Sequence, residues 1–107
     1  MDDLTKEQKK LLTSMYKEVL DRQQTLSFEE SNYFTDSDEV MELCYPGSDS
    51  DYVSSLCWSL ASSGYITCHP GDDLANDIEL TRKTIVYMEN RFKNILEKVL
   101  SFLVQFK

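Results

Sequence analysis

Apolar residues near the start of the chain recur every three or four positions, which is the spacing of one face of an α-helix. Thr5 and Gln8 stand three residues apart just before this stretch, as in a capping box. The pattern predicts a first helix over about residues 6–23. Its apolar face is expected to contain Leu11, Leu12, Met15, Tyr16, Val19 and Leu20.

The middle of the chain predicts two further helices. Residues 24–35 are irregular and are expected to form a loop with one short turn or strand. Asp36 and Glu39 form a second capping box, which begins a short helix that ends at Pro46 and Gly47. A third helix is expected over about residues 50–63, with Gly64 as its C-terminal cap.

Beyond the third helix the pattern indicates two strands followed by a long helix. Residues 65–69 read as a strand and residues 77–81 as a returning strand with alternating apolar positions. The segment 70–76 between them is rich in turn-forming residues, so a β-hairpin is expected. Thr81 then stands where it can cap a last helix over about residues 82–106.

The last helix carries an apolar stripe that is wider than one neighbouring element needs. One row has heptad-like spacing and consists of Ile85, Met88, Phe92, Ile95, Val99, Phe102 and Phe106. A second row consists of Leu96, Leu100 and Leu103. Because one domain does not easily cover both rows, we expect a homodimer that is joined largely by this helix. The alternative is a compact monomer whose last helix folds fully against the first helix and the 24–35 loop.

The order of these elements resembles that of winged-helix proteins. The segments YVSSLCWSLASSGYI and IELTRKTIVYMENRF are similar to the recognition helix, the first wing strand and the start of the last helix in small winged-helix proteins of bacteria and their phages. Among these proteins the chain resembles the YjcQ-like family, and the resemblance covers about residues 5–95. It implies an α+β, mostly helical fold with a β-hairpin wing and a long C-terminal helix. The length of the chain predicts one domain over residues 1–107.

Charge is distributed very unevenly along the chain. From Gln24 to Thr81 there is no Lys or Arg, against twelve acidic residues. These acids are Glu29, Glu30, Asp36, Asp38, Glu39, Glu42, Asp49, Asp51, Asp72, Asp73, Asp77 and Glu79. The cations lie in the first and last helices, and those of the last helix are Arg82, Lys83, Arg91, Lys93, Lys98 and Lys107.

This distribution argues against the usual function of a winged helix. Such proteins place the third helix in the major groove of DNA and take most of their affinity from Lys and Arg on phosphates. An acidic third helix and hairpin would repel phosphate. A solvated surface that keeps the protein soluble explains the same acids, and that explanation stays open.

The outward face of the third helix is the candidate partner-binding site. On a helical wheel this face consists of Asp51, Ser54, Ser55, Trp58 and Ser62. Trp58 has two interpretations: it packs under the hairpin or the last helix, or it is an interface anchor ringed by small polar residues.

The sequence contains no recognisable catalytic, cofactor or metal site. Cys44, Cys57 and Cys68 lack the paired spacing of a zinc site and are expected to be reduced, core-packed thiols. His69 is the single histidine, and no glycine-rich phosphate loop or nucleophile motif is present. The protein is therefore not expected to be an enzyme or to bind a cofactor.

The start of the chain has no basic segment followed by an apolar stretch, and no window has the roughly 20 uncharged apolar residues of a membrane span. A cytoplasmic location is expected. A last helix that lies on a membrane surface is a further alternative.

These observations favour a non-enzymatic protein-interaction module whose acidic helix and hairpin engage a basic protein surface. A DNA mimic, such as a phage-encoded inhibitor of a nucleic-acid-binding protein, is one version of it. The alternative is a dimeric winged-helix transcription regulator that binds DNA through the basic residues of the first and last helices.

Overall fold

The computed structural model describes the backbone of residues 2–71 and 73–104, and the side chains of residues 2–71 and 73–93. The structure is α+β and mostly helical, with a small antiparallel sheet. In chain order its elements are α1 (Lys6–Arg22), α2 (Phe28–Ser31), β1 (Phe34–Asp36), α3 (Ser37–Cys44), α4 (Ser50–Ser62), β2 (Ile66–Gly71), β3 (Leu74–Leu80) and α5 (Arg82–Val104).

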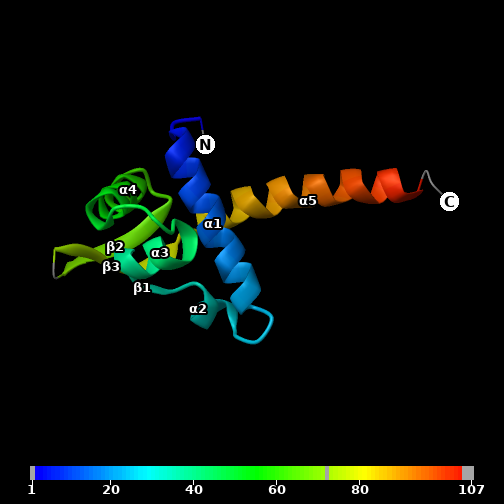
Figure 1. Cartoon of the computed structure of the whole chain (residues 1–107). Coiled ribbons are helices and arrows are strands. Elements are labelled where there is room, and N and C mark those ends of the chain that lie inside the picture. The colour runs from blue at the N-terminus through cyan, green and yellow to red at the C-terminus, as the bar shows by residue number, and fades with distance from the viewer. Residues whose placement is uncertain (1, 72, 105–107) are drawn as a thin grey trace.

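The sheet has the strand order β1-β3-β2, so the last strand lies between the other two (Figure 1). Phe34 of β1 pairs with Ile78 of β3, and Ile66 of β2 pairs with Leu80. All four side chains are buried. Strands that alternate in this way place one face on the core and leave the other to solvent.

The core lies between the sheet and helices α1, α3 and α4. Its fully buried large side chains include Leu11, Leu12, Met15, Val19, Phe34, Val40, Val53, Leu60, Ile66, Ile78 and Met88. The first helix buries the expected stripe apart from Leu20, which is 42% exposed near the end of the helix.

The helix ends follow the local signals in the sequence. Thr5 and Gln8 form the complete capping box of α1, and the Asp36 side chain accepts from the Glu39 backbone at the start of α3. At the end of α4, Gly64 adopts a φ of 82°, where the Tyr65 N–H donates to the Leu60 carbonyl. That is a Schellman cap, which requires a left-handed residue and therefore favours glycine.

The hairpin differs from its expected form. The segment 70–76 was predicted as a turn-rich tip, but β2 continues to Gly71 and β3 begins at Leu74. The Asn76 side chain donates to the carbonyls of Gly71 and Leu74, and Asp73 and Asp77 adopt positive φ angles. Aspartate tolerates this left-handed conformation better than most residues, so an acidic, polar segment still pairs as strands.

The 24–35 loop contains more structure than expected, because it forms both α2 and β1. Asn32 joins this segment to the sheet. Its side-chain amide is buried, and it donates to the Leu80 carbonyl and accepts from the Leu80 N–H. The amide thus pairs with Leu80 much as a neighbouring strand would.

The first turns of helix α5 contact the body, and its backbone then leaves the body in the direction opposite to the hairpin (Figure 1). Thr84 and Met88 are buried, and the Phe92 ring stacks on Tyr16 with a centroid distance of 5.6 Å. The molecule measures 56 × 32 × 27 Å. A compact monomer with α5 folded fully against α1 is therefore not the arrangement seen.

The predicted dimerisation residues fall in three groups. Ile85 is partly buried, Met88 is fully buried, and Phe92 is 36% exposed. Ile95, Leu96, Val99, Leu100, Phe102 and Leu103 belong to α5, but their side chains lie outside the described residues. Phe106 lies outside the described residues altogether. Among the described parts of the chain, no helix is long and apolar enough to span a membrane.

Candidate functional site

The outer surface of α4 is formed by four of the five predicted residues. Asp51, Ser55, Trp58 and Ser62 are exposed, and we call these four residues the α4 face. Ser54 is only 7% exposed, so its assignment to this face was wrong. The reason is that α4 packs against α3, β2 and β3 together, which buries a wider sector of the helix than one apolar stripe.

The serines of the α4 face use their hydroxyl protons within the helix. The Ser55 hydroxyl donates to the Tyr52 carbonyl at 2.9 Å, and the Ser62 hydroxyl donates to the Trp58 carbonyl at 3.0 Å. What these hydroxyls still offer to a partner is acceptor lone pairs. Together with the Asp51 carboxylate, they favour a partner that is rich in hydrogen-bond donors.

Trp58 is 37% exposed and is not a member of the buried core cluster. Trp58 is therefore not fully buried under the hairpin or α5, as one of the two interpretations of the sequence expected. Tyr52 is 41% exposed on the same helix. Its ring meets Tyr45 edge-on at a centroid distance of 6.4 Å. The exposed surface of α4 thus carries two aromatic side chains.

Acidic residues are also exposed on the neighbouring hairpin and on α3. Exposed carboxylates stand on the hairpin at Asp73, Asp77 and Glu79, and on α3 at Glu42. Asp77 accepts a hydrogen bond of 2.6 Å from the Tyr33 hydroxyl, and this bond raises the Tyr33 pKa. The bond also ties the hairpin to the segment before β1.

One cation reaches the end of α4 from another element. The Lys83 ammonium donates to the Ser63 carbonyl at 3.0 Å and lies 4.0 Å from the centre of the Tyr65 ring. A positive charge at a helix C-terminus stabilises the helix dipole. Lys83 thereby joins the first turn of α5 to the end of α4.

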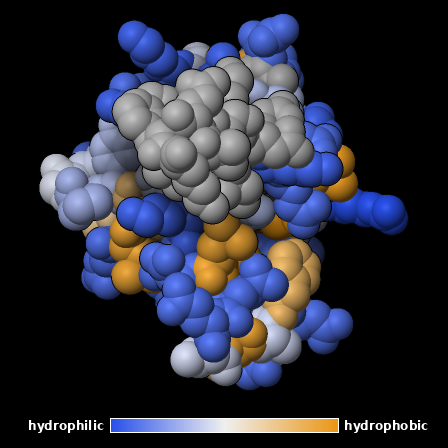
Figure 2. All heavy atoms as spheres, turned by 90° about the vertical axis from the view of Figure 1, so that its right-hand side faces the viewer, coloured by the Kyte–Doolittle hydropathy of each residue, from blue (hydrophilic) through white to orange (hydrophobic). Residues whose placement is uncertain are grey.

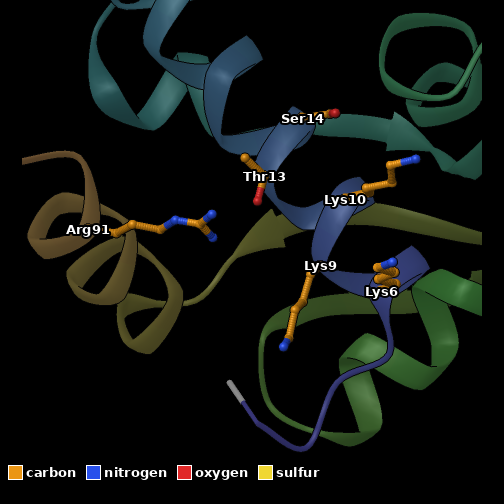
Figure 3. A pocket seen from close by; sticks show the side chains of 6 residues that line it. All are labelled: Lys6, Lys9, Lys10, Thr13, Ser14 and Arg91. Atoms are coloured by element: carbon orange, nitrogen blue, oxygen red, sulfur yellow. The ribbon is translucent and has the colours of Figure 1, made fainter. Parts of the chain in front are cut away.

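Four cations line a groove that is formed by α1 and α5. Lys6, Lys9, Lys10, Thr13 and Ser14 of α1 and Arg91 of α5 line a groove of about 510 Å³, which we call the α1–α5 groove (Figure 3). Arg91 extends from α5 toward the α1 side that carries Thr13 and Lys9, while Lys10 extends away from Arg91 (Figure 3). The face of the molecule from which α5 emerges also shows hydrophobic patches among hydrophilic residues (Figure 2).

The cysteines behave largely as expected. Cys57 is fully buried, whereas Cys44 and Cys68 are partly buried and pack against the core. Burial raises the pKa of the Cys57 thiol to about 12 and that of Cys44 to about 12. Such thiols are poor nucleophiles, since the thiolate is the reactive form. Across the described side chains, no group of His, Cys, Asp and Glu is placed to hold a metal ion.

Arg22, near the end of α1, is a structural residue. Its guanidinium donates to the Tyr33 carbonyl at 2.6 Å and pairs with Glu39 at 3.2 Å. It also lies over the Phe34 ring, 4.6 Å from the ring centre. Apart from Glu18, one turn earlier in α1, these partners come from later segments of the chain, so no local sequence signal indicates this role.

The comparisons with known proteins give no relative for this chain: no family model, no curated protein and no solved structure matches it.

Proposed function

We propose that the chain is a winged-helix protein, with α4 as its third helix and the β2–β3 hairpin as its wing. Two features support this. A helix pair, α3 and α4, precedes the hairpin, and β1 pairs with the returning strand of that hairpin. A winged-helix chain of bacterial or phage origin, similar to the YjcQ-like proteins, has this order of elements.

On that scaffold we propose a non-enzymatic protein-interaction module that binds a basic protein surface. The observation that carries this proposal is the α4 face, where Trp58 is exposed beside Asp51 and the two serine acceptors. A large aromatic ringed by small polar groups is the usual composition of an interface hot spot. The Asp51 carboxylate on the same face favours Lys and Arg on the partner and hinders nucleic acid.

A DNA mimic is one form of this function. The segment from Gln24 to Thr81 carries twelve acidic residues and no Lys or Arg, so its charge has the sign of a nucleic-acid backbone. A protein that normally grips phosphates with Lys and Arg would find similar charges here. An inhibitor encoded by a phage would act in this way.

We also propose that the chain forms a homodimer through α5. The helix projects from the body, and the apolar seam that buries Met88 against the body continues in sequence through Ile95 and Val99. A second copy of the chain would cover those positions at about 25 cal/mol for each Å² of apolar surface removed from water.

The single tryptophan makes the partner-binding proposal directly measurable, since all indole fluorescence of the protein comes from the α4 face. We expect an arginine-rich peptide to change the Trp58 emission with a micromolar midpoint that weakens as salt is added. Asp51→Lys is expected to weaken this binding several-fold.

Asp21→Lys is the matched control, because it makes the same change of charge at an exposed position on α1. The control should leave the midpoint nearly unchanged. An unchanged emission spectrum with the peptide at low salt, or equal effects of the two substitutions, would refute binding at the α4 face.

A further inference from the structure

The α1–α5 groove holds cations that have no acidic partner among the described side chains. The ion pairs of that part of the chain join Arg22 to Glu18 and Glu39 and involve none of the groove's residues. Glu7, which follows Lys6 in α1, uses its carboxylate to accept a hydrogen bond from the Tyr45 hydroxyl instead of pairing with a groove cation. Like charges that stand together without counter-charges attract an external anion.

The groove's donors follow one another along α1. Lys6, Lys10 and Ser14 are spaced at intervals of four residues, and Lys9 and Thr13 form a parallel row. Each helical turn therefore presents at least one cation or hydroxyl, about 5.4 Å after the last. Arg91 adds a guanidinium from α5 on the facing side (Figure 3). This is a linear array rather than a single anion pocket.

The residue types favour phosphate as the ligand. Contacts to a nucleic-acid backbone come chiefly from Arg, Lys, Ser and Thr, which are the residue types that line this groove. A phosphodiester chain presents evenly repeated negative charges, which suits donors repeated along a helix. Lys6, Lys10 and Arg91 are exposed, so an extended polymer can reach them.

We propose that the α1–α5 groove binds the phosphate backbone of a nucleic acid, on the side of α1 away from the α4 face. The Gln8 side chain donates to Ser59 of α4 at 2.7 Å, so α1 is the element that separates the two surfaces. This site is independent of the partner proposed for α4, and it differs from the major-groove docking that is usual for a winged helix.

The test is fluorescence anisotropy of the full chain with a labelled DNA duplex of about 20 base pairs and with one of its single strands. We expect micromolar binding at about 50 mM salt that weakens steeply by about 200 mM, with the duplex and single-strand arms showing which form is preferred. Lys9→Glu with Arg91→Glu should weaken binding at least about tenfold.

The matched control is Arg82→Glu with Lys93→Glu. This pair makes the same change of charge, and both residues are exposed on α5. Arg82 precedes Arg91 by nine residues and Lys93 follows it by two, so both lie on roughly the opposite side of the helix. The control should bind nucleic acid almost as well as the parent chain. Equal losses in the two pairs would show attraction by net charge alone and would overturn the site.

Two further measurements keep the outcome decisive. If the charge reversals unfold the chain, as judged by circular dichroism, the double variant Lys9→Gln with Arg91→Gln is used in their place. It should lower the slope of log Kd on log salt by about two.

No binding of DNA at low salt, or tighter binding of poly-glutamate than of DNA, would overturn the proposal. Trp58→Ala should leave nucleic-acid binding intact, so a failure at one surface is distinguishable from a failure at the other.

Discussion

At the scale of single residues, the buried polar groups are the most informative ones. Asn32 is 7% exposed and satisfies both backbone groups of Leu80. Nothing in the sequence around Asn32 marks it, because its partner lies 48 residues later. The Leu80 N–H and C=O need a partner such as this amide, because an unpaired backbone group in a core costs free energy.

Asn32→Ala is therefore expected to lower the free energy of unfolding by about 2–4 kcal/mol, because it leaves the N–H and C=O of Leu80 without partners. Urea denaturation measures this loss. Asn90→Ala, at an exposed position of α5, should change stability by less than about 0.5 kcal/mol. A comparable midpoint for the two variants would contradict the role of Asn32.

The buried Cys57 thiol should make the folded protein less stable at alkaline pH. Burial raises the pKa of this thiol to about 12, above the usual value of an unfolded cysteine. The folded state thus keeps a proton that the unfolded state gives up, so stability is complete below about pH 8.5 and falls as pH rises beyond it, by about 1.4 kcal/mol per pH unit for each such thiol.

Urea midpoints at pH 8 and at pH 10 test this expectation. Cys57→Ala should show a smaller decrease between the two pH values than the parent chain. Cys44, whose pKa burial also raises to about 12, accounts for part of the decrease that remains. Equal decreases in parent and variant would mean that Cys57 does not contribute.

At the scale of elements, Gly64 shows how one residue sets the end of a helix. Its φ of 82° lets β2 begin after only three residues beyond the end of α4. Gly64→Ala should cost about 1–2 kcal/mol, because a Cβ is unfavourable in the left-handed region. Gly64→Asn should cost less, since asparagine tolerates this conformation. Thermal unfolding followed by circular dichroism ranks the two, and the reverse order would contradict the strain argument.

The helices could be predicted from the sequence because their signals are local. The caps at Thr5, Asp36 and Gly64 and the apolar spacing between them placed α1, α3 and α4 within one or two residues of their observed ends. The extent of the hairpin was missed, since it depends on side-chain bonds from Asn76 and on aspartates in unusual conformations.

The candidate surfaces were predictable to different degrees. A helical wheel identified most of the α4 face, but it failed at Ser54 because burial depends on which elements pack against the helix. The α1–α5 groove could be foreseen only as two basic helices. That Arg91 faces Thr13 and Lys9 depends on the crossing of α5 over α1, and no local pattern encodes that crossing.

At the scale of the whole molecule, the projecting α5 predicts self-association. Light scattering at micromolar concentration should give about twice the chain mass of 12.4 kDa. Ile95→Lys with Val99→Lys places two charges in the apolar seam and should return the chain to the monomer mass while the helical signal of the body persists. A parent chain at the monomer mass would refute the dimer.

The separation of cations onto α1 and α5 has a consequence for the behaviour of the chain on charged surfaces. The formal net charge is −8, yet all eleven cations fall outside the segment from Gln24 to Thr81. Such a molecule has a large electric dipole, and it turns as it approaches a charged support. We expect it to be retained on a cation-exchange resin at neutral pH and low salt, with α1 and α5 facing the resin, although its pI of about 4.5 argues for the opposite.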